Sequence, residues 1–377
     1  ALPICPGAPR AGGAATFDAP AASRTHAMPN PPWHPERFAA RLPFLRRRAR
    51  LVAETRAFFG ARGYMEVETP CLVPVPGMEV HLRAFRSEYL PHLGAGERRA
   101  LWLRTSPELA LKRLLVAGAG PVFELARVWR NGEAGALHAP EFTMLEWYRP
   151  GLSFEGLMDE AEAFVRAVCP PVVAHAGVET DLRLPFQRLS VAEAFAGFCG
   201  GLDILGTEGD AARLRAEARR VGLPAREGEG WEDLFFRLLL ERVEPRIGRG
   251  RATFLTHWPA PQAALARRDP GDGRAALRFE LFVAGVELAN AFDELTDPAE
   301  QRGRFERDAA ERRRLYGAEG EGGSWGVDED FLRALEHGMP AGSGIALGFD
   351  RLAMLASGAR RIEDVLWLSS AAGPEAS

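Results

Sequence analysis

RVWRNGEAGALHAPEFTMLEWY, residues Arg127–Tyr148, indicates the fold of this chain more clearly than any other stretch. Arg130 follows one apolar strand, a loop rich in small residues comes next, and a second strand alternates in character. Side chains two apart on a strand share a face, so Met144, Glu146 and Tyr148 are expected to point the same way. A carboxylate beside a phenol suits a substrate that bears an ammonium group.

The same alternation is also typical of the solvated face of an antiparallel sheet, which is the plainer interpretation. A second stretch, GIALGFDRL at Gly344–Leu352, favours a binding site instead. Arg130 and Arg351 each stand in one of the two stretches, and arginine presents a rigid, permanently charged fork of donors to phosphate groups. Together the two stretches predict an ATP site built on an antiparallel sheet.

These stretches resemble the motifs of the class II aminoacyl-tRNA synthetases, and the wording of four segments is similar to the lysine branch. The segments are TSPELALKRLLVAG from Thr105, PEFTMLEWYRP from Pro140, GVELANAFDELTD from Gly285 and GSGIALGFDRL from Gly342. The chain more closely resembles the elongation factor P (R)-β-lysine ligases, truncated paralogues of lysyl-tRNA synthetase. The resemblance runs from about Trp33 to about Ser369. It implies an α+β class II synthetase catalytic fold, an antiparallel sheet flanked by helices.

Length and composition predict one soluble globular protein. The 377 residues are 46% apolar, which suffices for a substantial core. Residues 1–32 are rich in Ala, Pro and Gly and are expected to form a disordered extension, within which Met28 is a candidate start. Residues 33–377 are expected to form the catalytic domain. A weakly patterned insertion at about 172–251 carries charged helices and no chemical signature.

Charge and cysteine usage exclude several classes of protein. The net charge of -4 gives no overall basic footprint of the kind that nucleic-acid binders show. Cys5, Cys71, Cys169 and Cys199 have no CxxC spacing, which favours the reducing cytoplasm over a disulfide framework or zinc site. No apolar run approaches the roughly 18 residues of a membrane span. Lys112, the only lysine, stands outside any glycine-rich run, so a Walker A loop is excluded.

Local patterns predict the elements around these motifs. Leu42–Gly60 is typical of an amphipathic helix with Pro43 in its first turn, followed by a strand at Tyr64–Thr69. By resemblance these two elements form the homodimer interface, and the alternative is an ordinary surface helix. The remaining predicted elements are a strand at Leu101–Arg104, a helix at Pro107–Ala117, a helix capped by Ser153, a hairpin of Phe279–Val283 with Val286–Phe292, and a polar, solvent-facing helix at Pro298–Tyr316.

The resemblance implies how ATP would be held. Arg130 would bind the α-phosphate and the substrate carboxylate, and Arg351 would bind the far phosphates. Each arginine would contribute to catalysis by aligning the reacting groups and by stabilising negative charge on the phosphates. The other implied ATP-binding residues are Asn131, Gly132, Ala139, Glu287, Leu288 and Gly348. Glu287 and Glu294 resemble the family's magnesium ligands, and carboxylate oxygens suit that hard ion. Residues seven apart on a straight strand face opposite sides, so a bend near Asp293 is expected.

The resemblance also implies an amino-acid pocket. Its expected residues are Ser106, Pro107, Glu108, Glu146, Tyr148, Glu294 and Ala346. Lysyl-tRNA synthetases carry glycine at the last of these positions and the elongation factor P ligases carry alanine. Ala346 therefore favours (R)-β-lysine over lysine, and the alternative is an alanine that only packs a helix.

Several departures from the family pattern affect the second motif. Its Arg-Asn-Glu has become Arg130-Asn131-Gly132, with Glu133 available as a replacement. The other changes are Ala136 and Leu137 in place of an arginine, His138-Ala139-Pro140 in place of His-Asn-Pro, and Ala291 in place of a glycine. These changes concern ATP contacts more than amino-acid contacts. Slower activity, altered contacts and lost activity are the three outcomes that the sequence leaves open.

The function predicted from these observations is ATP-dependent activation of (R)-β-lysine, or of lysine, and its transfer to a lysine of elongation factor P. A lysyl-tRNA synthetase-like activity on RNA is the second hypothesis. It is less favoured because those enzymes carry a large N-terminal oligonucleotide-binding barrel, and about 40 residues precede the first motif here. A non-catalytic regulatory paralogue is the third hypothesis, favoured by the departures in the second motif.

Overall fold

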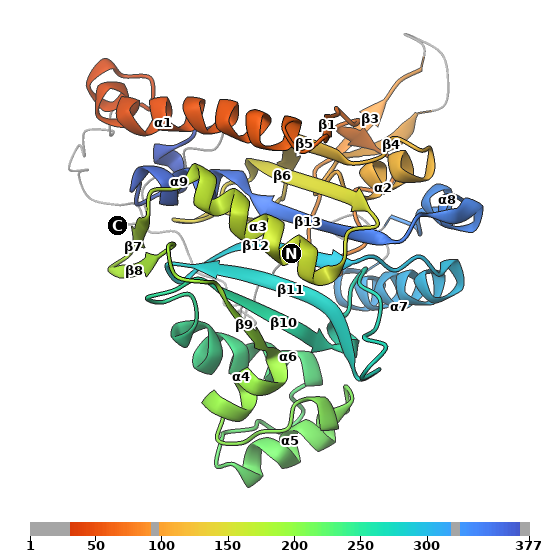
Figure 1. Ribbon diagram of the computed structural model, residues 1–377. Coiled ribbons are helices and arrows are strands. Elements are labelled where there is room, and N and C mark those ends of the chain that lie inside the picture. The colour runs from red at the N-terminus through yellow and green to blue at the C-terminus, as the bar shows by residue number, and fades with distance from the viewer. Residues whose placement is uncertain (1–30, 92–97, 318–324, 370–377) are drawn as a thin grey trace, which may run out of the picture.

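A single large sheet forms the centre of the computed structural model, which describes residues 31–91, 98–317 and 325–369 (Figure 1). Its strands are β1 (Met65–Glu66), β5 (Val122–Trp129), β6 (Glu141–Pro150), β9 (Gln187–Ser190), β10 (Thr253–Pro259), β11 (Ala275–Val283), β12 (Val286–Asp293) and β13 (Gly342–Gly348). The order is β1-β5-β6-β13-β12-β11-β10-β9. The pairs from β5 to β10 are antiparallel, whereas β1 and β9 join the edges in parallel. The α+β class is confirmed, and the sheet is mixed at its two edges.

Helices cover the sheet and bury its apolar side chains. They are α1 (Pro35–Gly60), α2 (Glu108–Val116), α3 (Phe154–Val168), α4 (Val191–Phe198), α5 (Ala211–Arg220), α6 (Trp231–Leu238), α7 (Pro298–Tyr316), α8 (Glu329–Gly338) and α9 (Phe349–Ser357). The largest core lies between the sheet and α1, α3 and α9, where Phe59, Trp147 and Phe164 pack together. In the described part of the chain, no helix is both long and apolar enough to cross a bilayer.

Several predicted elements are confirmed together with their local causes. The hairpin of β11 and β12 turns through Ala284 and Gly285, whose φ angles of 53° and 72° suit the two central positions of a tight hairpin. Ser153 caps α3 by accepting a hydrogen bond from the amide of Gly156. The helix α2 and the strand β4 (Arg99–Leu103) also lie where the pattern placed them.

The first helix and strand differ from the prediction. The helix α1 begins at Pro35, so Pro43 lies inside it and not in its first turn. Proline at the first helical position needs no backbone donor, and Pro35 fills that position here. The strand that follows is only Met65–Glu66, because it pairs with β5 at just two residues. Of the predicted extension at 1–32, residues 1–30 lie outside the described residues.

The polar helix α7 has the predicted bounds, but its charges do not all face solvent. Arg304 is buried and donates hydrogen bonds to the carbonyl oxygens of Ala264 and Ala266. Arg312 is buried beside the ring of Trp325. An arginine can be buried when its donors are satisfied and its guanidinium stacks on an aromatic face. Hydrophobic patterning alone could not distinguish these arginines from solvated ones.

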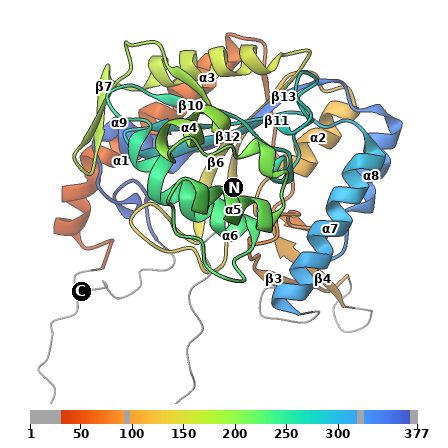
Figure 2. The ribbon, with the colours of Figure 1, turned by 90° about the horizontal axis from the view of Figure 1, so that it is seen from below.

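The segment from 172 to 251 forms a lobe at one end of the sheet. It contains the small hairpin of β7 (Val172–His175) and β8 (Val178–Asp181), the edge strand β9, and helices α4, α5 and α6. Figure 2 shows these three helices together on one side of the molecule. They enclose a core of their own, in which Phe235 stacks on Phe195 and Trp231. Its status as an insertion stays a prediction.

A smaller layer flanks the other end. The short strands β2 (Leu72–Val73), β3 (Arg86–Tyr89) and β4 form a three-stranded sheet in the order β2-β4-β3. A core that includes Trp102, Phe305 and Phe331 joins this layer to α7 and α8. The helix α2 packs against α8 and against β6 of the central sheet, and its first turn reaches the site described next.

Candidate active site

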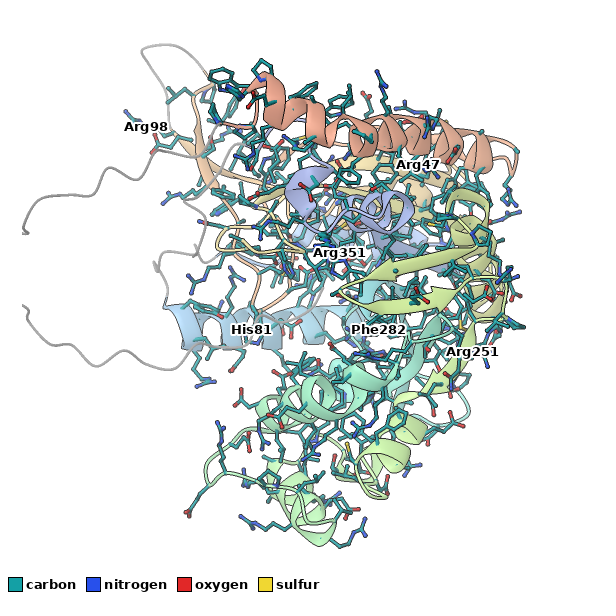
Figure 3. The ribbon with its side chains drawn as sticks, turned by 90° about the vertical axis from the view of Figure 1, so that its left-hand side faces the viewer. Arg47, His81, Arg98, Arg251, Phe282 and Arg351 are labelled. Carbon is teal, nitrogen blue, oxygen red and sulfur yellow. The ribbon has the colours of Figure 1, made fainter. Side chains whose placement is uncertain are left out.

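A pocket opens over β6, β12 and β13 and is roofed by the loop between β5 and β6. Eight of the predicted residues line it, namely Arg130, Gly132, Ala139, Glu287, Leu288, Ala346, Gly348 and Arg351. Asn131 is not among the lining residues, and its backbone N–H donates a hydrogen bond to the carbonyl oxygen of Arg83. Figure 3 shows Arg351 near the centre of that face of the molecule, whereas Arg98 and Arg251 lie toward its edges. The two sequence motifs therefore meet in one cavity.

Arg130 is held at one wall of this pocket. Its guanidinium lies over the ring of Phe142, 5.2 Å from the centroid, and 3.7 Å from a carboxylate oxygen of Glu133. Glu133 is buried and lines the pocket as well. The glycine before it makes this possible, because Gly132 has a φ of 85°, a conformation that other residues rarely adopt. Glu133 thus stands beside Arg130 despite its one-residue shift in sequence.

Arg351, in the first turn of α9, is engaged on every nitrogen of its guanidinium. Its Nη1 donates to the carbonyl oxygen of Glu287 at 2.8 Å and lies 3.1 Å from Oε2 of the same residue. Its Nη2 lies 2.8 Å from Nε2 of His138, and its Nε donates to the carbonyl oxygen of Leu137. Burial, together with this guanidinium, lowers the pKa of His138. His138 is therefore neutral and accepts the hydrogen bond.

The strand β12 carries an irregularity that the sequence placed wrongly. Leu281 pairs with Ala289 and Phe282 pairs with Glu287, so Leu288 is an extra residue in a β-bulge. Beyond the bulge, pairing with β13 continues regularly to Asp293. The bend expected near Asp293 is therefore wrong, and the bulge instead brings Glu287 and Leu288 to the same pocket.

Two buried carboxylates that were not predicted for the site, Glu280 and Glu244, interact with Glu287. Glu280 is fully buried, and its Oε2 has no hydrogen-bond partner among the described residues. Burial and the neighbouring charge of Glu287 raise the pKa of Glu280 to about 7, against the opposing effect of Arg278. Burial, with Glu280 and Glu287 nearby, raises the pKa of Glu244 to about 8. Sequence reasoning missed Glu280, although it lies two residues from Arg278 on the hairpin it had identified.

These oxygen donors fit a magnesium ion only in part. Within the described ranges, no three His, Cys, Asp or Glu side chains are grouped to hold a metal by themselves. Mg²⁺ is usually bound by one or two carboxylates, waters and substrate phosphates. Glu287 lines the pocket, and Glu280, which pairs with the pocket-lining Asn290 across the hairpin, has a buried carboxylate oxygen without a hydrogen-bond partner among the described residues. Glu294 instead forms an ion pair with Lys112.

The amino-acid end predicted from β6 is a closely packed polar cluster. Glu146 is fully buried and accepts hydrogen bonds from Ser106 Oγ at 2.8 Å and from Tyr148 Oη at 2.9 Å. The backbone amide of Glu108 donates to the same Ser106 hydroxyl. The interpretation of this face as solvated is therefore wrong. Burial, and next the charge of Glu108, raises the pKa of Glu146 to about 8.

Lys112 was set aside as a sequence signal, yet it lies at the centre of this cluster. Its Nζ is 2.6 Å from Glu108 Oε1 and 2.5 Å from Glu294 Oε2. Its side chain is 1% exposed. The available signal was the spacing, since Glu108 and Lys112 are four apart and so face each other on a helix. Glu294, predicted as a magnesium ligand with Glu287, pairs with Lys112 in this structure, and its role as a ligand stays a prediction.

Two positions on β13 shape this end of the pocket. A Cβ atom added to Gly344 would lie 2.1 Å from the ring of Tyr148 and 2.7 Å from Glu294 Oε1. Only glycine leaves room for both side chains. Ala346 lies beside Glu146 and Asn290 on neighbouring strands, so it faces the pocket from a strand and does not pack a helix.

The fold and the site define a class of protein. Residues 38–371 match the family of class II tRNA synthetases for Asp, Lys and Asn, and the chain belongs to this family. The elongation factor P (R)-β-lysine ligase of Haemophilus influenzae strain PittGG is 42% identical over 336 residues, 89% of this chain and 96% of that protein. The ligase of the same name from strain ATCC 51907 / DSM 11121 / KW20 / Rd is 42% identical over 322 residues, 85% of this chain and 93% of that protein.

Proposed function

We propose that this protein is an ATP-dependent ligase that activates (R)-β-lysine, or lysine, and transfers it to a lysine side chain of elongation factor P. The observation that carries the proposal is that a buried cluster of carboxylates and a phenol adjoins the pocket that holds the two arginines, since Ala346 lines this pocket and pairs with Glu146. The names of the two similar proteins support the same activity.

The first step joins the amino acid to AMP. An oxygen of the substrate carboxylate attacks the α-phosphorus, the bond to the bridging oxygen of the β-phosphate breaks, and pyrophosphate leaves with that oxygen. Arg130 neutralises charge at the α-phosphate and the carboxylate, and Arg351 does so at the far phosphates. Arg351 exchanges its contacts with Glu287 and His138 for contacts with phosphate oxygens.

The second step transfers the acyl group to the protein. The amine of the target lysine attacks the carbonyl carbon of the adenylate, AMP departs, and the amine loses one proton as the amide forms. The carboxylates of Glu108, Glu146 and Glu294 hold the ammonium groups of the substrate throughout, which keeps its carboxyl carbon near Arg130. Holding the reacting groups in the correct geometry accounts for much of the rate enhancement in reactions that need no covalent intermediate with the protein.

Magnesium belongs with the phosphates in this proposal. Glu287 and Glu280 would hold it through oxygen atoms, and it would neutralise phosphate charge and favour departure of pyrophosphate. Glu294 remains a prediction as a metal ligand. Its ion pair with Lys112 instead favours a role at the amino-acid end.

The altered second motif is compatible with ATP binding. The family pattern has its glutamate at position 132, and here Glu133, one residue later in the sequence, lies beside Arg130. Ala139 and Leu137 line the pocket as apolar surface and present no charge to it. We infer that the base of ATP is held by packing and by Glu133, which favours an active enzyme over a regulatory paralogue.

The homodimer built on α1, the cytoplasmic location and the absence of tRNA as a partner are parts of the same proposal. One experiment separates the candidate activities. The protein is incubated with labelled amino acid, ATP and magnesium, and both tRNA and elongation factor P are supplied. Label on elongation factor P alone supports the proposal, and label on tRNA would replace it with the synthetase alternative. Absence of ATP–pyrophosphate exchange with every amino acid would leave the regulatory alternative.

A further inference from the structure

The only lysine of this chain is one of its most deeply buried polar side chains. The chain has 47 lysine and arginine residues, of which 46 are arginines and one is Lys112. It lies on α2, is fully enclosed, and faces the rings of Tyr148 and Phe292 at 5.9 and 5.8 Å from their centroids. A lysine is rarely buried unless it is paired, and this one is paired twice. Its two partners come from different elements.

The ammonium of Lys112 links two elements of the polar cluster at the predicted amino-acid end. Glu108 stands in the first turn of α2, and Glu294 directly follows β12. Their oxygens lie 2.6 and 2.5 Å from the same nitrogen. The other oxygen of Glu294, Oε1, has no hydrogen-bond partner in the described part of the chain and is turned toward Gly344 and Tyr148. A buried oxygen without a donor is costly unless a ligand supplies one.

Glu146 differs from these two carboxylates. Its hydrogen bonds come from the neutral hydroxyls of Ser106 and Tyr148, and among the described residues no cation lies within ion-pair distance of it. Lysine places a compact positive charge with three donors at its tip, so Lys112 can satisfy Glu108 and Glu294 but leaves Glu146 uncompensated. An incoming ammonium group is therefore attracted most strongly to Glu146 and the free oxygen of Glu294.

We propose that Lys112 is a positioning residue that occupies the cation position between Glu108 and Glu294 and so directs the distal ammonium group of the substrate to Glu146 and Tyr148. The proposal rests on the proposed function and specifies the recognition of its substrate. Without Lys112, three carboxylates compete for one ammonium group, and the substrate settles with its carboxyl carbon displaced from Arg130. With Lys112, one arrangement is favoured over the others.

The single lysine allows a direct test in the unmodified protein. When lysine labelled with ¹³C at the ε carbon is incorporated, the folded protein gives one side-chain resonance, that of Lys112. Addition of lysine or (R)-β-lysine should shift this resonance, because a second ammonium group arrives in the same cluster. Norleucine, which has the same chain without the distal ammonium, should leave it near its original position. An unchanged resonance at saturation with a diamino acid, judged by calorimetry, would overturn the proposal.

A substitution supplies the second test. Lys112→Met keeps a similar length and removes the charge, and we expect kcat for amino-acid-dependent exchange to fall roughly tenfold or more because the substrate is bound out of line, while the KM for ATP stays the same. Arg113→Gln is the matched control, since Arg113 is the next residue on α2 but pairs with Asp328 at 3.0 Å outside the pocket. A Lys112→Met enzyme with a normal kcat and only lowered thermal stability would show a structural role and refute the proposal.

The two levels of inference fail in different ways. If the parent protein binds and activates no diamino acid, the proposed function is wrong. If the parent activates a diamino acid but its Lys112 resonance and the variant's kcat are unaffected, the function stands and the role of Lys112 is wrong. If Lys112→Met does not fold, the resonance of the parent protein still decides the question.

Discussion

Affinity for the amino acid should depend steeply on pH, because the carboxylate that receives the ammonium group is buried. Burial raises the pKa of Glu146 to about 8, and hydrogen bonds from Ser106 and Tyr148 oppose that shift only partly. Below that value, Glu146 is protonated and offers no negative charge to an ammonium ligand. The ammonium of a lysine side chain stays protonated well above this range, so the enzyme and not the ligand controls the profile.

The expected magnitude follows from the fraction of Glu146 that is ionised. Each pH unit below the pKa reduces that fraction about tenfold, so the affinity at pH 6 should be roughly a hundredfold lower than at pH 9. Glu294 also has its pKa raised to about 8 by burial, so the measured midpoint belongs to the pocket carboxylates together. Affinity therefore increases as pH rises and levels off above about 8.

Calorimetric titration of the diamino acid between pH 6 and pH 9 measures this directly. Glu146→Gln provides the comparison, since it keeps the shape of the side chain and removes its titration. That variant should bind weakly, with a shallower dependence on pH. A dissociation constant for the parent protein that stays within twofold from pH 6 to pH 9 would refute the reasoning, because it would mean that Glu146 is already ionised throughout or does not contact the ligand.

Three further predictions concern single substitutions, and a fourth concerns the dependence of stability on pH. Replacing Arg351 with alanine should lower exchange roughly a hundredfold or more, with lysine restoring it only partly, and near-normal exchange in the alanine variant would contradict its assignment to the phosphates. Gly344→Ala should raise the KM for the amino acid, since its methyl group would overlap the ring of Tyr148, and an unchanged KM would show that the ring moves freely. Ala346→Gly should shift the preference between lysine isomers toward lysine roughly tenfold, and an equal ratio in both proteins would place selectivity elsewhere. Between about pH 4.5 and pH 8, the folded protein keeps a proton on Glu146 that the unfolded chain releases, because the pKa of Glu146 is raised to about 8 in the folded state. The contribution of Glu146 to the free energy of unfolding should therefore decrease as pH rises through this interval. A melting temperature that increases over the same interval would contradict this expectation.

The sequence predicted those parts of the site that depend on regular alternation. Glu146 and Tyr148 share a face because β6 is unbroken. Arg130 and Arg351 line the pocket because Arg130 directly follows β5 and Arg351 stands in the first turn of the helix that follows β13. Glu287 was assigned to the site by resemblance, but the irregularity expected near Asp293 lies instead at Leu288, where a bulge sets the orientation of Glu287. A bulge adds one residue to one strand, and no composition signal in this stretch marked it.

Contacts between distant elements were beyond the reach of the sequence pattern. Lys112 meets Glu294 only because α2 packs against the end of β12, 182 positions further along the chain. Arg304 and Arg312 had the spacing of solvated charges, and only the structure shows the carbonyl groups and the indole ring that enclose them. Glu280 was overlooked because a glutamate on a buried strand has no distinctive spacing of its own. Such contacts depend on tertiary packing, which overrides local preference.

The burial of the only lysine has a consequence for the chemistry of the surface. A ligase that makes an aminoacyl adenylate keeps a reactive acyl donor close to its own side chains, and free amines are the groups that such a donor modifies. Apart from Lys112, which is enclosed among carboxylates, this chain carries its positive charge as arginine. Guanidinium groups stay protonated and are poor nucleophiles. The protein thus offers its own product no side-chain amine to attack, and an accessible lysine on a partner is the acceptor that remains.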